Sequence, residues 1–143
     1  MRDLPDFDGL GAGGKGEGMS HLNPLFSSAS VEWNTPKKVY EALDAEFHFT
    51  LDPCTKNSLW DGRAISWHQH RVYCNPPYGP QIGTWLQKAP EAEVAVYLLP
   101  ARTDTRWFHN FCLLAKEIRF IRGRLKFGDA KHGAPFPSMI VIF

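Results

Sequence analysis

The sequence predicts an α/β fold in which a mostly parallel sheet is covered by helices on both faces. Three observations support this prediction. Residues 94–99 form a continuous apolar run, which is typical of a strand buried on both faces of a parallel sheet. Short apolar runs alternate with segments of helical spacing. With 143 residues, 43% of them hydrophobic, the chain is long enough for one domain with a sizeable core.

Each element has a local signal. Thr35 can cap a first helix with Pro36 in its first turn, since a threonine oxygen accepts from unpaired N–H groups and the φ of proline is helical. Thr103 or Asp104 can cap a later helix in the same way. The expected elements are, in chain order, a helix after Pro36, strands at 47–51 and 71–74, a short helix at 82–88, a strand at 94–99, a helix at 104–114, and strands at 118–121, 125–127 and 139–143.

The N-terminal segment has a different composition. Residues 9–18 contain mostly glycine, which is too flexible to order without apolar partners. No strand precedes this stretch, so it does not match a phosphate-binding loop. We expect residues 1–30 to form a flexible tail and residues 31–143 to form the catalytic domain.

Charge and cysteine content narrow the class of protein. The net charge is only +1, so contact with nucleic acid must come from local patches. Cys54, Cys74 and Cys112 cannot all pair, which favours reduced thiols and a cytoplasmic protein. No apolar run is long enough to span a membrane, and no secretory signal is visible. The cysteines and histidines lack the spacing of a zinc site, so we expect no metal.

The segment Asn75-Pro76-Pro77-Tyr78 carries the strongest chemical signal. It directly follows the predicted strand at 71–74. Two prolines fix two φ angles, remove two N–H donors and keep the preceding residues out of the helical region. The carbonyl groups near Asn75 and Pro76, together with the Asn75 side chain, are therefore fixed acceptors beside the flat ring of Tyr78. This arrangement suits a planar group held through its NH2; the alternative is a proline-rich turn with a buried tyrosine.

The tetrapeptide resembles the Asn/Asp/Ser-Pro-Pro-Tyr/Phe motif of amino-methyltransferases. Further stretches resemble the small phage-type DNA N6-adenine methyltransferases, the phage Dam family, and follow that family's order from about residue 31 to 143. These stretches are Glu32-Trp33-Asn34-Thr35-Pro36, Leu51-Asp52-Pro53-Cys54, Cys74-Asn75-Pro76-Pro77-Tyr78-Gly79, Leu99-Pro100-Ala101-Arg102-Thr103-Asp104-Thr105, Trp107-Phe108-His109, Gly123-Arg124-Leu125-Lys126-Phe127 and Ala134-Pro135-Phe136-Pro137-Ser138.

The resemblance implies a reduced Rossmann-like methyltransferase fold and transfer of a methyl group from S-adenosyl-L-methionine to N6 of adenine in DNA. It also implies a phage or prophage enzyme that acts in the cytoplasm of a bacterial host. The catalytic residues would be Asn75, Pro76, Pro77 and Tyr78. The base would be flipped from a duplex or taken from a single strand. The target sequence and the oligomeric state stay open.

By the same resemblance, Asp52 and Pro53 are the counterpart of the family's glycine-rich cofactor motif. The Asp52 carboxylate would hold the amino group of the donor through a charge-assisted bond. Thr35 and Pro36 match a motif that contacts the methionine end of the donor, and Trp33 would cover its adenine ring. The alternatives are a turn cap for Asp52, helix capping for Thr35 and Pro36, and a core tryptophan at position 33.

A basic segment follows the predicted strand at 94–99. Arg102, Thr103, Arg106 and Trp107 would lie on the same rim as Asn75 if the two strands were parallel. Arginine beside an aromatic ring suits a phosphate and an unstacked base. Later positive charge would extend a phosphate track, through Arg124 and Lys126 together with Arg119 and Arg122. The alternatives are a solvated helix terminus and scattered surface charge.

The segment between Asp52 and Asn75 is short. About twenty residues separate these two positions, too few for a full crossover helix with further strands. No separate target-recognition domain is present in the sequence. Two alternatives therefore stay open, which donor binding would separate. One is methylation of another nitrogen (cytosine N4, RNA adenine or a protein glutamine), although Asn75 disfavours cytosine; the other is a non-catalytic DNA-binding relic.

Overall fold

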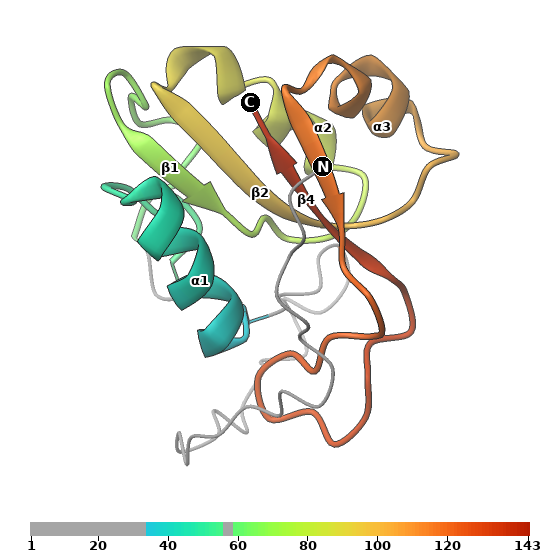
Figure 1. Cartoon of the computed structure of the whole chain (residues 1–143). Coiled ribbons are helices and arrows are strands. Elements are labelled where there is room, and N and C mark those ends of the chain that lie inside the picture. Colours follow the sequence, from blue (N-terminus) through green and yellow to red (C-terminus); the bar gives the residue numbers. More distant parts are fainter. Residues whose placement is uncertain (1–33, 56–58) are drawn as a thin grey trace.

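The computed structural model of the protein describes residues 34–55 and 59–143. The expected tail at 1–30 and Trp33 lie outside these residues. One sheet has the strand order β1-β2-β4-β3 (Figure 1). The elements are α1 (Lys37–Phe47), β1 (Arg71–Cys74), α2 (Ile82–Leu86), η2 (Ala89–Glu91), β2 (Val94–Pro100), α3 (Arg106–Asn110), η3 (Cys112–Leu114), β3 (Glu117–Phe120) and β4 (Ser138–Ile142), where η marks a 3₁₀ helix.

The sheet is mixed, so the prediction of a mostly parallel sheet is wrong for the described strands. β1 and β2 pair in parallel, whereas β4 is antiparallel to both β2 and β3. The cause lies in residues 121–137, which join β3 to β4 without a helix. A parallel neighbour would need a crossover connection, while a loop returns the chain antiparallel to the strand it leaves.

Three predicted elements differ from the structure. Residues 125–127 form no strand, and the predicted helix at 104–114 divides into α3 and η3. The cap of α3 is Thr105, whose side chain accepts from the Phe108 N–H, in place of Thr103 or Asp104. The predicted strand at 47–51 is reduced to one parallel bridge between Leu51 and Val72.

The end of α1 explains why that strand is so short. His48 has a left-handed φ of 54°, and its backbone N–H bonds the Asp44 carbonyl at 2.8 Å. The Asp44 carboxylate accepts from the Phe49 N–H at 2.9 Å. These bonds turn the chain sharply out of the helix, and the segment then meets β1 only at its end, where Thr50 bonds Arg71 and Leu51 bridges to Val72.

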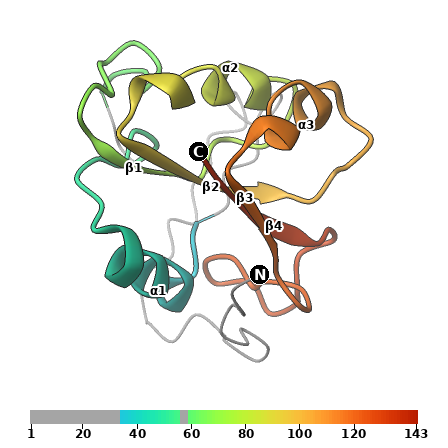
Figure 2. The same cartoon turned by 45° about the horizontal axis from the view of Figure 1, so that its top comes forward.

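Helices cover both faces of the sheet, as predicted (Figures 1 and 2). On one face, the Tyr40 ring of α1 lies edge-on to Tyr73 of β1, with ring centroids 5.1 Å apart. On the other face, the Tyr97 hydroxyl of β2 donates to the Trp85 carbonyl of α2 at 2.8 Å. β2 lies between these layers and is buried from Ala95 to Pro100, which confirms the prediction from its apolar run.

A buried arginine joins the helix layer to the far edge of the sheet. Arg119 of β3 is 5% exposed. Its guanidinium donates two bonds of 2.7 Å to Glu46 of α1 and bonds Glu117 at 2.8 and 3.0 Å. Because a buried charge is costly unless it is paired, this cluster holds α1 and β3 together.

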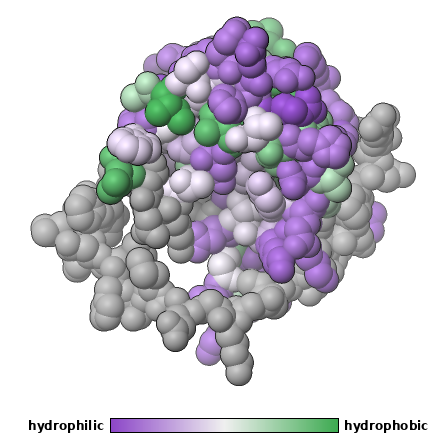
Figure 3. Space-filling model, turned by 90° about the vertical axis from the view of Figure 1, so that its left-hand side faces the viewer, coloured by the Kyte–Doolittle hydropathy of each residue, from purple (hydrophilic) through white to green (hydrophobic). Residues whose placement is uncertain are grey.

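The molecular surface is mainly polar on the side that carries α1 and β1, where hydrophobic residues are scattered among hydrophilic ones (Figure 3). Scattered exposed hydrophobic residues are ordinary for a folded protein. Among the described helices, none is long and apolar enough to cross a membrane.

The arginine cluster makes a first prediction. Replacing Arg119 with alanine leaves Glu46 and Glu117 side by side without their partner, so the free energy of unfolding should fall by about 3 kcal/mol. Urea denaturation measures this change. Arg122→Ala, at an exposed position two residues beyond β3, is the control. Equal losses for the two variants would show that the cluster contributes nothing specific.

Candidate active site

Three chain segments meet at one edge of the sheet. Asp52 follows Leu51, which bridges to Val72 in parallel. Asn75 follows β1, and Arg102 comes shortly after β2. Because β1 and β2 are parallel, their carboxyl ends lie at the same edge, where open α/β sheets bind ligands. The expectation that Arg102 shares a rim with Asn75 is therefore confirmed.

A first pocket of about 580 Å³ opens at this edge. Its volume is within the range of small-molecule sites, about 300–1,000 Å³. The pocket brings together most of the predicted cofactor residues with part of the proline turn, although Pro36 is not among its lining residues. The predicted residues that line it are Thr35, Asp52, Pro53, Asn75 and Pro77.

Thr35 has a different role from the predicted helix cap. Pro36 is the N-cap of α1, and no side chain caps this end. The Thr35 hydroxyl instead lies 2.5 Å from the Tyr73 hydroxyl and accepts from Asn75 Nδ2 at 3.1 Å. The Asn75 side chain is thus oriented by a residue forty positions away. Burial raises the pKa of Tyr73 well above its usual value, so the phenol stays protonated in this chain of bonds.

Asp52 places a carboxylate in the wall of the first pocket. One of its oxygens accepts from the Cys54 N–H at 3.0 Å. Burial raises the pKa of Asp52, and the bond from Cys54 opposes part of that rise. Tyr40 and Trp85 provide aromatic surface in the same pocket. A cationic ligand would therefore find a negative charge beside aromatic rings.

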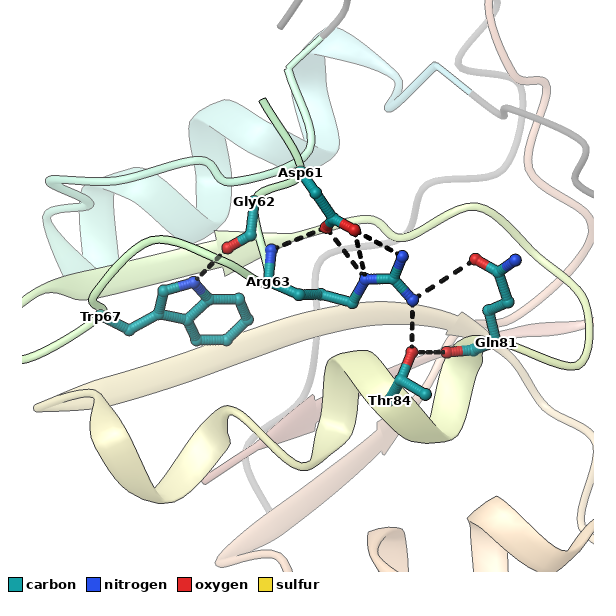
Figure 4. Close-up of polar contacts among 6 residues, drawn as sticks. All are labelled: Asp61, Gly62, Arg63, Trp67, Gln81 and Thr84. Atoms are coloured by element: carbon teal, nitrogen blue, oxygen red, sulfur yellow. Dashed lines mark hydrogen bonds and ion pairs between the residues drawn. The ribbon is translucent and has the colours of Figure 1, made fainter. Parts of the chain in front are cut away.

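The first pocket is also lined by Asp61, Gly62 and Arg63, which were not among the residues expected from the sequence. Arg63 bonds the Asp61 carboxylate through Nε and Nη2, and its Nη1 donates to Thr84 at 2.8 Å (Figure 4). These bonds lower the pKa of Asp61 to about 2. Gly62 lies so close to Pro53 that an added Cβ would be 1.9 Å from the Pro53 oxygen. The Asp-Gly dipeptide was the available sequence signal, since it marks a tight turn.

A second pocket of about 560 Å³ lies on the other side of the proline turn. Tyr78, Gly79 and Pro80 line it, and they meet part of the predicted nucleic-acid segment there. The Arg102 guanidinium lies 5.8 Å from the centroid of the Phe136 ring. Thr105 lines this pocket, whereas Thr103 does not. The remaining lining residues are Ile82, Pro100, Arg102, Arg106, Trp107, Pro135 and Phe136.

Tyr78 is fixed rather than mobile. Its side chain is 8% exposed, and its hydroxyl donates to the Leu98 carbonyl at 3.2 Å. The rings of Phe127 and Phe136 meet it edge-on at centroid distances of 6.3 and 5.5 Å. A small part of the ring therefore faces the second pocket from a rigid position.

The later basic residues divide into two groups. Arg119 is buried in its ion-pair cluster, so its expected place in a phosphate track is wrong. Arg124 is exposed in loop 121–137 and donates to the Ala134 carbonyl at 3.4 Å. Lys126 is half-buried in the same loop. Arg124 and Lys126 line neither pocket, so any contact they make with nucleic acid lies outside the central site.

The raised pKa of Asp52 predicts how the stability of the fold depends on pH. Because burial raises its pKa in the folded protein, the folded state binds the proton more tightly than the unfolded chain does. Stability should then fall as pH rises from the unfolded pKa of about 3.9 through the raised folded value. Asp52→Asn should therefore be more stable than the parent at pH 7, and the difference should vanish below about pH 3.9.

Urea denaturation of the parent and Asp52→Asn across pH 3–8 measures this difference. Asp129→Asn, at an exposed carboxylate in loop 121–137, is the matched control. If Asp52→Asn were less stable than the parent at pH 7, Asp52 would be a stabilising turn cap rather than a carboxylate held at a cost.

A family model described as DNA N-6-adenine-methyltransferase (Dam) matches residues 25–143. No curated protein and no solved structure gives a significant match. Within the described residues, no three histidine, cysteine, aspartate or glutamate side chains are grouped to hold a metal ion. Since the family model spans the sheet, the proline turn and both pockets, the chain belongs to the DNA N-6-adenine-methyltransferase family and is an enzyme that methylates adenine in DNA.

Proposed function

We propose that the protein uses S-adenosylmethionine as the methyl donor and binds it in the first pocket, while the second pocket receives the target nucleotide. One observation carries this proposal. The proline turn separates the two pockets: Asn75 and Pro77 line the first, and Tyr78, Gly79 and Pro80 line the second. Asn75 lines only the first pocket, and the buried Pro76 lines neither, so the target base would have to extend from the second pocket along the turn to reach Asn75.

The first pocket suits the donor by charge and by shape. The donor supplies an electrophilic methyl group on a sulfonium ion and carries an amino group at its methionine end. Asp52 would accept from that amino group through a charge-assisted bond. The Tyr40 ring can attract a cationic group, while Trp85, whose face is already covered by Arg63, offers only its remaining apolar surface. Thr35 and Pro53 complete the same wall.

Asn75 and Pro76 would hold the adenine amino group. The Asn75 amide donates its N–H to Thr35, and its carbonyl oxygen, which is buried, would accept an N6 hydrogen once the side chain turns toward the base. The Pro76 carbonyl would accept the second hydrogen. With both N–H bonds directed in this way, the nitrogen lone pair points at the methyl group, and positioning supplies most of the rate enhancement. The product amine releases its proton to solvent.

The second pocket suits a nucleotide taken out of the base stack. Trp107 and Phe136 offer aromatic surface for the base, and Arg102 and Arg106 offer charge for the flanking phosphates. Extrusion from a duplex costs a few kcal/mol, which such contacts would offset. Thr103, Arg124 and Lys126 would contact phosphates further from the target. The substrate is then a duplex from which the base is flipped, or a single strand.

The test of the proposed function is direct. Purified protein is incubated with donor labelled in its methyl group and with DNA, and the DNA is digested to nucleosides. Label in N6-methyladenine is the expected result. Label in N4-methylcytosine would overturn the target assignment. Absence of label with intact, folded protein would overturn the proposed roles of the two pockets.

Asn75→Ala tests the chemical step. The variant loses one of two acceptors that orient the amino group, so single-turnover methylation should slow on the order of 10²-fold or more. Donor affinity should change little, because the contact is to the base. Gln87→Ala, an exposed amide outside both pockets, is the control. A parent-like rate at saturating substrates would mean that the turn is only scaffold.

The two arginines of the second pocket, Arg102 and Arg106, lead to a separate prediction about DNA binding. Arg102→Ala with Arg106→Ala should weaken binding and reduce the slope of log affinity against log salt by about 0.9 for each lost phosphate contact. The control is Lys116→Ala, since Lys116 bonds Ile142 at the opposite end of the sheet. Fluorescence anisotropy at several salt concentrations measures both slopes. An unchanged slope in the double variant would make these arginines ordinary surface residues.

A further inference from the structure

Arg63 uses its guanidinium to join two parts of the first pocket. Its Nε and Nη2 bond the Asp61 carboxylate at 2.9 and 2.6 Å. Its Nη1 bonds the side chains of Thr84 at 2.8 Å and Gln81 at 3.4 Å (Figure 4). A guanidinium has five N–H donors, and these contacts occupy all but one. Arg63 is therefore committed mainly to protein groups and retains little capacity for a ligand.

The same guanidinium covers Trp85. Its central carbon lies 5.1 Å from the centroid of the ring. Trp85 is 5% exposed and contributes to the pocket wall from α2. A cation over an indole face is attracted by the ring, so Arg63 fixes both the start of α2 and the aromatic surface that α2 presents.

Movement of Arg63 would be transmitted to the Asp52 segment. Gly62 precedes Arg63 and packs on the Pro53 backbone without room for a side chain. The Gly62 carbonyl accepts from the buried Trp67 indole at 2.9 Å, which holds this turn from the other side (Figure 4). Pro53 directly follows Asp52. The chain of contacts from α2 to the pocket carboxylate therefore passes through Arg63, Gly62 and Pro53.

We propose that Arg63 is a positioning residue for the methyl donor. It holds loop 61–67 against α2 and so keeps Asp52, Pro53 and Trp85 at the spacing that donor binding needs. This inference rests on the proposed function, because it assigns the first pocket to the donor. It predicts that loss of Arg63, or of a partner that lies outside the pocket, weakens donor binding and leaves DNA binding unchanged.

Thr84 allows the positioning role to be separated from direct contact. It bonds Arg63 but is not among the residues that line either pocket. Thr84→Val keeps the shape of the side chain and removes both the acceptor for Arg63 and the bond that the Thr84 hydroxyl donates to the Gln81 carbonyl. Ser66→Ala is the matched control, since Ser66 lies in the same loop and its hydroxyl bonds only the His68 N–H among the described contacts.

The experiment titrates S-adenosylmethionine, and separately a duplex oligonucleotide, into the parent and variants by calorimetry. Arg63→Ala should raise the donor Kd on the order of tenfold or more. Arg63→Lys should bind nearly as weakly, because lysine lacks the planar fork. Thr84→Val should raise the donor Kd about threefold. In the Arg63→Ala background the same change should raise the donor Kd little further, because the two side chains act together. The affinity for the duplex oligonucleotide should equal that of the parent in every variant. The donor Kd of Ser66→Ala should also equal that of the parent.

Each other outcome overturns a definite statement. If donor affinity falls in Arg63→Ala but stays at the parent value in Thr84→Val, Arg63 contacts the donor directly, and its positioning role is overturned. Parent-like donor affinity in both variants would overturn it as well. If Arg63→Ala fails to fold, Thr84→Val alone decides. If the parent binds no donor, the proposed function fails, and the inference fails with it.

Discussion

The site depends on the parallel pairing of β1 with β2, in which Tyr73 lies opposite Val96 and Cys74 opposite Tyr97. Strands that run in the same direction end at the same edge, and the loops that leave them then converge. The single bridge from Leu51 to Val72 adds a third parallel segment, so Asp52 reaches this edge too. Without this direction, the pocket carboxylate, the proline turn and the basic rim would lie at different ends of the sheet.

The short connection between Asp52 and β1 is compensated by close packing. Residues 59–70 contain no regular element, yet the Trp67 indole is fully buried and bonds the Gly62 carbonyl. Gly62 lets this loop approach Pro53 more closely than any residue with a Cβ allows. No Gly-x-Gly stands beside Asp52 in the sequence, and Gly62 of the neighbouring loop packs directly on Pro53. A full crossover helix is therefore not required to build a pocket at this edge.

Local signals predicted β2, the turn at Asn75 and the place of Arg102, because an apolar run, two prolines and a strand end are properties of neighbouring residues. The direction of a strand and the distant partners of a side chain are not properties of neighbouring residues, and these were not predicted correctly from the sequence. Nothing within β4 itself indicates that it runs antiparallel to β2; the helix-free loop before it sets that direction. Thr35 has the chemistry of a helix cap, and only the fold shows that its hydroxyl instead joins Tyr73 and Asn75. Arg63 was missed because two of its partners, the N-cap residue Gln81 and Thr84 of α2, lie 18 and 21 residues away.

The titratable groups of the site favour positioning over acid–base catalysis. Burial raises the pKa of both Tyr73 and Tyr78. Both phenols are therefore already protonated near neutral pH, and neither can accept the proton that the target amino group loses. The Asp52 carboxylate lines the first pocket, where burial raises its pKa. In the proposed mechanism, an amino group held by fixed acceptors needs no strong base, because it becomes cationic only in the transition state. The proline turn would provide that geometry, and the contacts of Asn75 with Thr35 and of Tyr78 with Leu98 hold the turn in place.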